Sequence, residues 1–146
     1  MPLADLKGKT VMVAAADKYA ARHLAKELEK LGATVVYSKR SPHHPGAVPV
    51  IEEEVKNHVP KIDALIIHVS NVELEESHDT AVQLIQNLKA HCPVIVCDFC
   101  KSKVAIQGLQ EAGAKYLNYL DLENNQIAAA VADTVAQQGK AGRTAG

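Results

Sequence analysis

The feature that most constrains this fold is the regular alternation of short aliphatic runs with longer stretches of helical periodicity. The aliphatic runs are rich in valine, isoleucine and alanine, which is typical of strands buried on both faces. The intervening stretches place apolar residues three or four positions apart, as the core-facing side of a helix does. We predict strands over residues 10–15, 34–37, 64–69, 94–97 and 116–119, and helices over residues 18–31, 50–58, 79–90, 103–112 and 124–138.

This order of elements predicts an α/β fold in which a doubly wound five-stranded parallel sheet carries helices on both faces. Five strand-helix units are too few for a closed eight-stranded barrel, so the flavodoxin-like (βα)5 strand order 2-1-3-4-5 is expected. Residues 1–138 are predicted to form one domain, and residues 139–146, without an apolar anchor, a disordered tail. The three prolines and one glycine of residues 38–49 predict a loop without regular structure.

Composition excludes several classes of function. The formal net charge is −1, with no excess of lysine and arginine, so no nucleic-acid partner is expected. No apolar run reaches the roughly 18 residues that span a bilayer, and the N-terminus does not resemble a signal peptide, so no membrane association is expected. The three clustered cysteines, Cys92, Cys97 and Cys100, do not suggest an extracellular disulfide framework, which favours a cytoplasmic protein.

Three segments carry a resemblance to a known family. Residues 109–117 read Leu-Gln-Glu-Ala-Gly-Ala-Lys-Tyr-Leu, residues 93–96 read Pro-Val-Ile-Val, and residues 63–67 read Asp-Ala-Leu-Ile-Ile. These segments resemble the fifth, fourth and third strand regions of response-regulator receiver domains. The resemblance covers about residues 8–137 and implies the flavodoxin-like fold and a role in signalling.

The positions that carry phosphotransfer chemistry in receivers differ in this chain. The phospho-accepting aspartate at the end of the third strand corresponds to His68, and the acidic pair that holds Mg²⁺ corresponds to residues 14–16, all alanine, with Asp17 next. The family's Ser/Thr after the fourth strand corresponds to Asp98, and its lysine after the fifth corresponds to Tyr119. The resemblance therefore implies a degenerate pseudo-receiver, for which we assign no catalytic residue, cofactor or metal.

The resemblance also implies a surface for a protein partner or for a homodimer. Receivers commonly bind partners through the fourth helix, fifth strand and fifth helix. The corresponding candidate residues in this chain are Val104, Gln107, Gly108, Tyr119, Asn125 and Ala129.

A different class of function, small-ligand binding or enzymatic, would use the crevice at the carboxyl ends of strands one, three and four. A nucleotide or another cofactor would then be the ligand. The candidate residues at that crevice are Asp17, His68, Ser70, Asn71, Asp98 and Cys100. On the alternative interpretation, strand-end loops are simply polar, and Asp17 and Ser102 are helix caps.

A second resemblance concerns the opening of the chain. Residues 6–13 and 28–36 resemble the start of a short-chain dehydrogenase. The glycine-rich fingerprint for a pyrophosphate is absent between them, so dinucleotide binding is disfavoured.

Two side-chain types near the strand ends could titrate or bind a metal. Cys97 and Cys100 form a C-x-x-C pair, but Cys97 ends a buried strand and is expected to be a small core residue. For His68, a nearby Asp17 or Asp98 is expected to favour the charged imidazole and hence a permanently set or pH-biased conformation.

Overall fold

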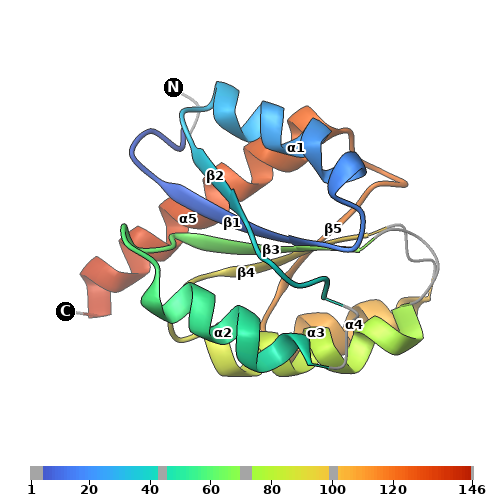
Figure 1. Ribbon diagram of the computed structural model, residues 1–146. Helices are drawn as coiled ribbons and strands as arrows, with labels where there is room; N and C mark the ends of the chain where they lie inside the picture. Colours follow the sequence, from blue (N-terminus) through green and yellow to red (C-terminus); the bar gives the residue numbers. More distant parts are fainter. Residues whose placement is uncertain (1–4, 43–45, 70–73, 99–101, 146) are drawn as a thin grey trace.

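The computed structural model describes residues 5–42, 46–69, 74–98 and 102–145. They form a five-stranded parallel sheet of order β2-β1-β3-β4-β5 with helices on both faces (Figure 1), which confirms the predicted flavodoxin-like fold. In chain order the elements are β1 (Thr10–Ala15), α1 (Lys18–Lys30), β2 (Thr34–Tyr37), α2 (Ala47–Asn57), β3 (Ala64–His68), α3 (Leu74–Leu88), β4 (Val94–Asp98), α4 (Lys103–Ala112), β5 (Lys115–Asn118) and α5 (Asn124–Ala145).

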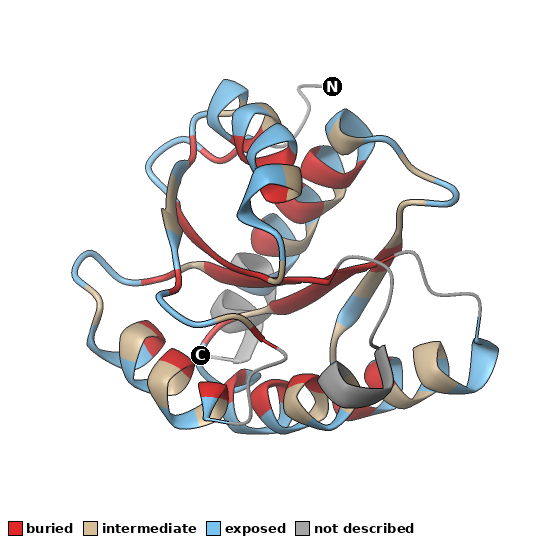
Figure 2. Cartoon of the chain, turned by 45° about the vertical axis from the view of Figure 1, so that its right-hand side comes forward, coloured by how far each residue is buried: buried red, intermediate tan, exposed pale blue. Residues whose placement is uncertain are grey.

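The alternation of side chains along the central strands produces two hydrophobic cores. Helices α1 and α5 cover one face of the sheet, and α2, α3 and α4 cover the other (Figure 1). On β3, Ile66 faces the first core while Leu65 and Ile67 face the second. Strands β1, β3 and β4 are buried along their whole length (Figure 2). Because both faces of these strands are covered, their residues are apolar apart from Thr10, His68 and Asp98 at the strand ends.

Helix ends follow local hydrogen-bonding chemistry where the sequence marks them. The Asp17 carboxylate accepts from the N–H groups of Tyr19 and Ala20 at the start of α1, and the Ser102 hydroxyl accepts from Ala105 N–H at the start of α4. Helix α4 ends at Gly113, whose φ of 118° lies in the left-handed region that favours glycine. Both predicted N-caps are therefore confirmed.

Helices α2 and α3 begin earlier than expected. Helix α2 starts at Ala47, so Pro49 lies in its first turn instead of in a loop. A proline is compatible with a first turn, where its missing N–H has no intrahelical acceptor. Helix α3 starts at Leu74 instead of Asp79.

Helix α5 continues to Ala145, through the segment for which the sequence predicts disorder. Residues 139–145 contain no proline, and Lys, Arg and Ala are strong helix formers, whereas Gly139 and Gly142 are weak ones. Within the described part of the chain, no helix combines the length and the apolar composition that crossing a membrane requires.

Candidate functional site

The carboxyl ends of the central strands bring three predicted site residues to one edge of the sheet. The register pairs Ala15 of β1 with His68 of β3, and His68 with Cys97 of β4. Asp17 follows β1 after one residue, and Asp98 is the last residue of β4. The other three candidates, Ser70, Asn71 and Cys100, lie outside the described residues.

His68 and Tyr119 form a hydrogen-bonded pair at this edge. The distance between Nε2 of His68 and the Tyr119 hydroxyl oxygen is 2.9 Å, and the two rings pack edge to face with centroids 5.4 Å apart. The backbone sets this geometry, because the Tyr119 N–H donates to the Asp98 carbonyl oxygen at 2.9 Å and so continues the β4–β5 ladder. The side chains that end β3 and follow β5 therefore meet across the end of β4.

Burial keeps the His68 imidazole neutral at pH 7. Its side chain is 1% exposed, and desolvation lowers its pKa to about 4. The nearby Asp17 carboxylate acts in the opposite direction but does not compensate for burial. The expectation that a neighbouring carboxylate favours charged His68 is therefore wrong, since loss of hydration outweighs the attraction of a carboxylate engaged in a helix cap.

Tyr119 is also held in its neutral form. Burial raises the pKa of its hydroxyl, and the Cys97 thiol contributes in the same direction. The pair consequently joins two neutral groups at positions where the receiver resemblance predicts an aspartate and a lysine. Tyr119 was expected on the partner surface, and its contact with His68 was not predicted, although His68 ends β3 and Tyr119 follows β5 at the same end of the sheet.

Asp17 serves as a helix cap. Its Oδ1 accepts from Tyr19 N–H at 2.9 Å and from Ala20 N–H at 3.3 Å, which satisfies two of the free amides at the start of α1. Such a carboxylate can still act electrostatically on His68. The donors of both hydrogen bonds to the Asp17 carboxylate are backbone N–H groups.

The thiols near the sheet have the properties of core residues. Cys97 is fully buried, and burial raises the pKa of its thiol far from the physiological range. Burial also raises the pKa of Cys92, to about 11. Among the residues that the structure describes, no three His, Cys, Asp or Glu side chains lie close enough to hold a metal ion.

The predicted partner residues differ in their exposure to solvent. Val104 is 80% exposed, and Asn125 and Ala129 are exposed on α5. Gln107 is exposed and donates from Nε2 to Glu111 Oε1 at 3.0 Å.

Gly108 lies on the side of α4 that contacts α3. A Cβ atom on Gly108 would lie 3.3 Å from the His78 ring of α3, so this glycine permits close helix packing. The ring of Tyr119 is directed toward His68, as its hydrogen bond requires. Gly108 and Tyr119 therefore contribute to packing beneath the predicted partner surface. The exposed side chains of that surface come from α4 and α5.

Comparison with solved structures defines the class of fold. The strand order, the crossovers and the five helices match those of response-regulator receiver domains. No protein-family model and no curated protein matches the sequence.

Three of the similar structures illustrate the match. A response regulator from Thermotoga maritima superposes with a TM-score of 0.68 at 19% identity, over 88% of this chain and 98% of that chain. A response regulator receiver protein from Pseudoalteromonas atlantica gives 0.65 at 16%, over 88% and 98%. An orphan response regulator of H. pylori gives 0.63 at 13%, over 88% and 97%. At these identities the likeness shows a shared fold.

Proposed function

We propose that this chain is a receiver-like signalling module that binds a protein partner without accepting a phosphoryl group. The observation that carries the proposal is the His68–Tyr119 hydrogen bond at the carboxyl edge of the sheet. In receivers, which this chain resembles, the corresponding positions carry the phospho-accepting aspartate and a lysine. Here an uncharged imidazole and an uncharged phenol form a hydrogen bond through Nε2 of His68 and the Tyr119 hydroxyl group.

The surroundings of His68 also disfavour phosphotransfer. A phosphoryl donor must reach the accepting atom, and the His68 side chain is almost fully buried. Mg²⁺ requires several oxygen ligands, but β1 ends in Ala14 and Ala15, and the Asp17 carboxylate caps α1. Asp98 is the remaining described carboxylate at these strand ends, which is too few for a hard divalent cation.

The same hydrogen bond suggests how the module would hold one conformation. It connects the end of β3 to the residue after β5, and β5 lies between α4 and α5 on the proposed partner face. A switch requires two arrangements that a signal can favour differently. A neutral pair that is joined by a hydrogen bond inside the molecule favours one arrangement, so we infer a permanently set surface.

The proposed partner face would be the exposed side of α4 and α5, with a protein partner or a second copy as the bound molecule. The test compares Ala129→Glu on that face with Ala90→Glu, which adds the same charge at an exposed position in the turn after α3, outside the face. Pull-downs and sedimentation should show that Ala129→Glu weakens association about tenfold or more, whereas His68→Ala weakens it less. If His68→Ala abolishes an activity that Ala129→Glu retains, the strand-end crevice is the working site.

That outcome would favour the second candidate, binding of a nucleotide or cofactor in the crevice. The observation behind it is the His68 Nδ1 atom, which is buried and has no hydrogen-bond partner among the described residues. Buried polar atoms are normally paired, and a ligand can supply the missing partner. Thermal unfolding with and without ATP, NAD or FMN would detect such a ligand as a rise in midpoint.

A further inference from the structure

The outer edge of β2 offers hydrogen-bonding groups to an added strand. Among the described strands, β2 pairs with β1 alone, and the N–H groups of Thr34 and Ser38 donate to the Lys9 and Val13 carbonyl oxygens, each at 2.9 Å. A parallel strand turns alternate residues toward one neighbour, so the N–H and C=O groups of Val35 and Tyr37 point to the open side.

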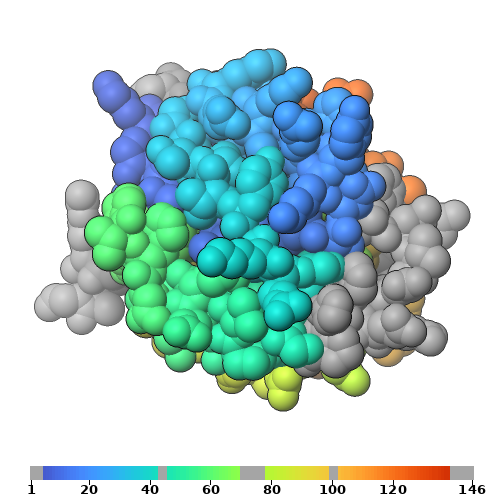
Figure 3. All heavy atoms as spheres, in the orientation of Figure 1, coloured from blue at the N-terminus to red at the C-terminus, as the bar shows by residue number. Residues whose placement is uncertain are grey.

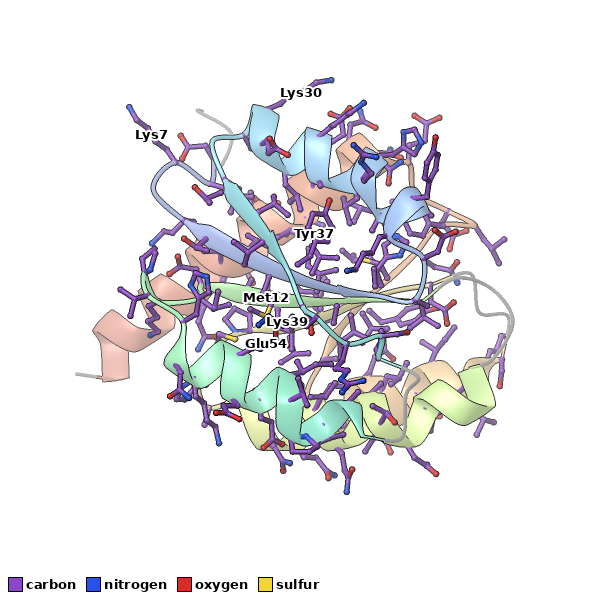
Figure 4. The ribbon with its side chains drawn as sticks, viewed as in Figure 1. Lys7, Met12, Lys30, Tyr37, Lys39 and Glu54 are labelled. Atoms are coloured by element: carbon purple, nitrogen blue, oxygen red, sulfur yellow. The ribbon has the colours of Figure 1, made fainter. Side chains whose placement is uncertain are left out.

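A groove runs beside this open edge, between β2 and α2. Its volume is about 540 Å³, and Figure 3 views the molecule from the side on which β2 and α2 both reach the surface. The side chains of Met12, Lys39 and Glu54 lie close together between β2 and α2 (Figure 4). The residues that line the groove include Met12, Val36, Tyr37, Lys39, Glu53 and His58.

The wall of the groove is fixed without any ligand. Glu54 of α2 accepts from the Ser38 hydroxyl at 2.7 Å and from the Lys39 N–H at 3.0 Å. The Ser38 hydroxyl oxygen accepts in turn from the Arg40 N–H at 3.1 Å. These bonds tie the end of β2 to α2, so the groove and the strand edge keep their relative positions, which lowers the cost of ordering on binding.

Charge around the groove favours a basic occupant. Glu53 is exposed on the wall, and within the described part of the chain it makes no ion pair. Glu54 contributes a second carboxylate and Lys39 one ammonium group, so carboxylates outnumber ammonium groups in the lining. The apolar floor, Met12 and Val36, suits the aliphatic stem of a lysine or arginine.

We propose that this edge-and-groove site binds an extended segment of a partner protein by strand addition to β2. A lysine or arginine of that segment points into the groove toward Glu53. Backbone hydrogen bonds to Val35 and Tyr37 supply affinity, and the groove supplies specificity. The site lies at the edge of the sheet opposite β5, so it is independent of the α4–β5–α5 face.

The test uses a synthetic peptide of about six residues, alternating valine and lysine and blocked at both ends. Fluorescence anisotropy measures its affinity, and ¹⁵N spectra locate it. We expect shifts at β2 and α2, and about tenfold weaker binding after N-methylation of alternate peptide amides. Equal binding of the N-methylated peptide, no binding at all, or shifts confined to β5 would overturn the proposal.

Two protein variants test separately the backbone hydrogen bonds of β2 and the negative charge of the groove. Tyr37→Pro removes an outward N–H while leaving the β1–β2 bonds, and it should abolish binding with the β1 resonances unchanged. Glu53→Gln should weaken binding of the lysine peptide about threefold, and Glu123→Gln, the same change beyond β5, should not. Unchanged affinity in Glu53→Gln contradicts the basic occupant. A stable dimer that Tyr37→Pro dissociates would instead assign the edge to a second copy.

Discussion

At the scale of single residues, the contact between His68 and Tyr119 is the observation on which the proposed function rests. The receiver resemblance assigned each position correctly to a strand end, but it did not predict that the two side chains meet. The contact spans β4 and depends on ring orientations and on the register of β5. None of these can be read from the residues that surround His68 or Tyr119 in sequence.

The depressed pKa of His68 predicts an acid-dependent loss of stability. The folded-state pKa of about 4 lies below the ordinary histidine pKa of 6.5, so the unfolded chain binds the proton more tightly. This contribution is fully present above pH 6.5 and is lost as pH falls toward 4. A lowering of the pKa from 6.5 to about 4 corresponds to about 3 kcal/mol of unfolding free energy.

Urea unfolding at a series of pH values measures this dependence, and His68→Gln should flatten it between pH 6.5 and 4. Imidazole proton shifts in NMR spectra report the same group directly. An inflection for His68 near pH 6.5 in the folded protein would show that the imidazole is hydrated and that the burial argument fails.

At the scale of elements, helix ends were predicted correctly where a capping residue marks them in the sequence. Asp17, Ser102 and Gly113 were identified from residue type, and each has the expected cap geometry. The predicted start of α2 was wrong, because a proline is compatible both with a loop and with the first turn of a helix. Pro49 suggests a loop, yet it is accommodated in the first turn of α2.

The cap at the start of α1 supports a second stability prediction. Asp17→Ala leaves the Tyr19 and Ala20 amides without their acceptor, and it should lower the unfolding free energy by about 1 kcal/mol. Asp17→Asn is the matched control, because an amide oxygen can still accept from both amides, and it should retain most of the stability. Equal losses in the two variants would assign the effect to the carboxylate charge instead of to capping.

At the scale of the whole molecule, the alternation of strands and helices was enough to predict the sheet and its order. Strands β1, β3 and β4 must be buried on both faces, and their aliphatic composition reflects this requirement. The functional surfaces were less predictable, because they depend on how elements pack. The groove beside β2 arises from α2 and β2 together, and neither segment indicates it alone.

The central claim concerns the whole module: a receiver-like fold that does not accept phosphate. Incubation with Mg²⁺ and acetyl phosphate, followed by intact mass measurement, tests it most directly, with a phosphorylatable receiver domain processed in parallel as the positive control. We predict an unchanged mass for this chain, because His68 is buried, neutral and bonded to Tyr119. A gain of one acid-labile phosphoryl group per chain would contradict the account.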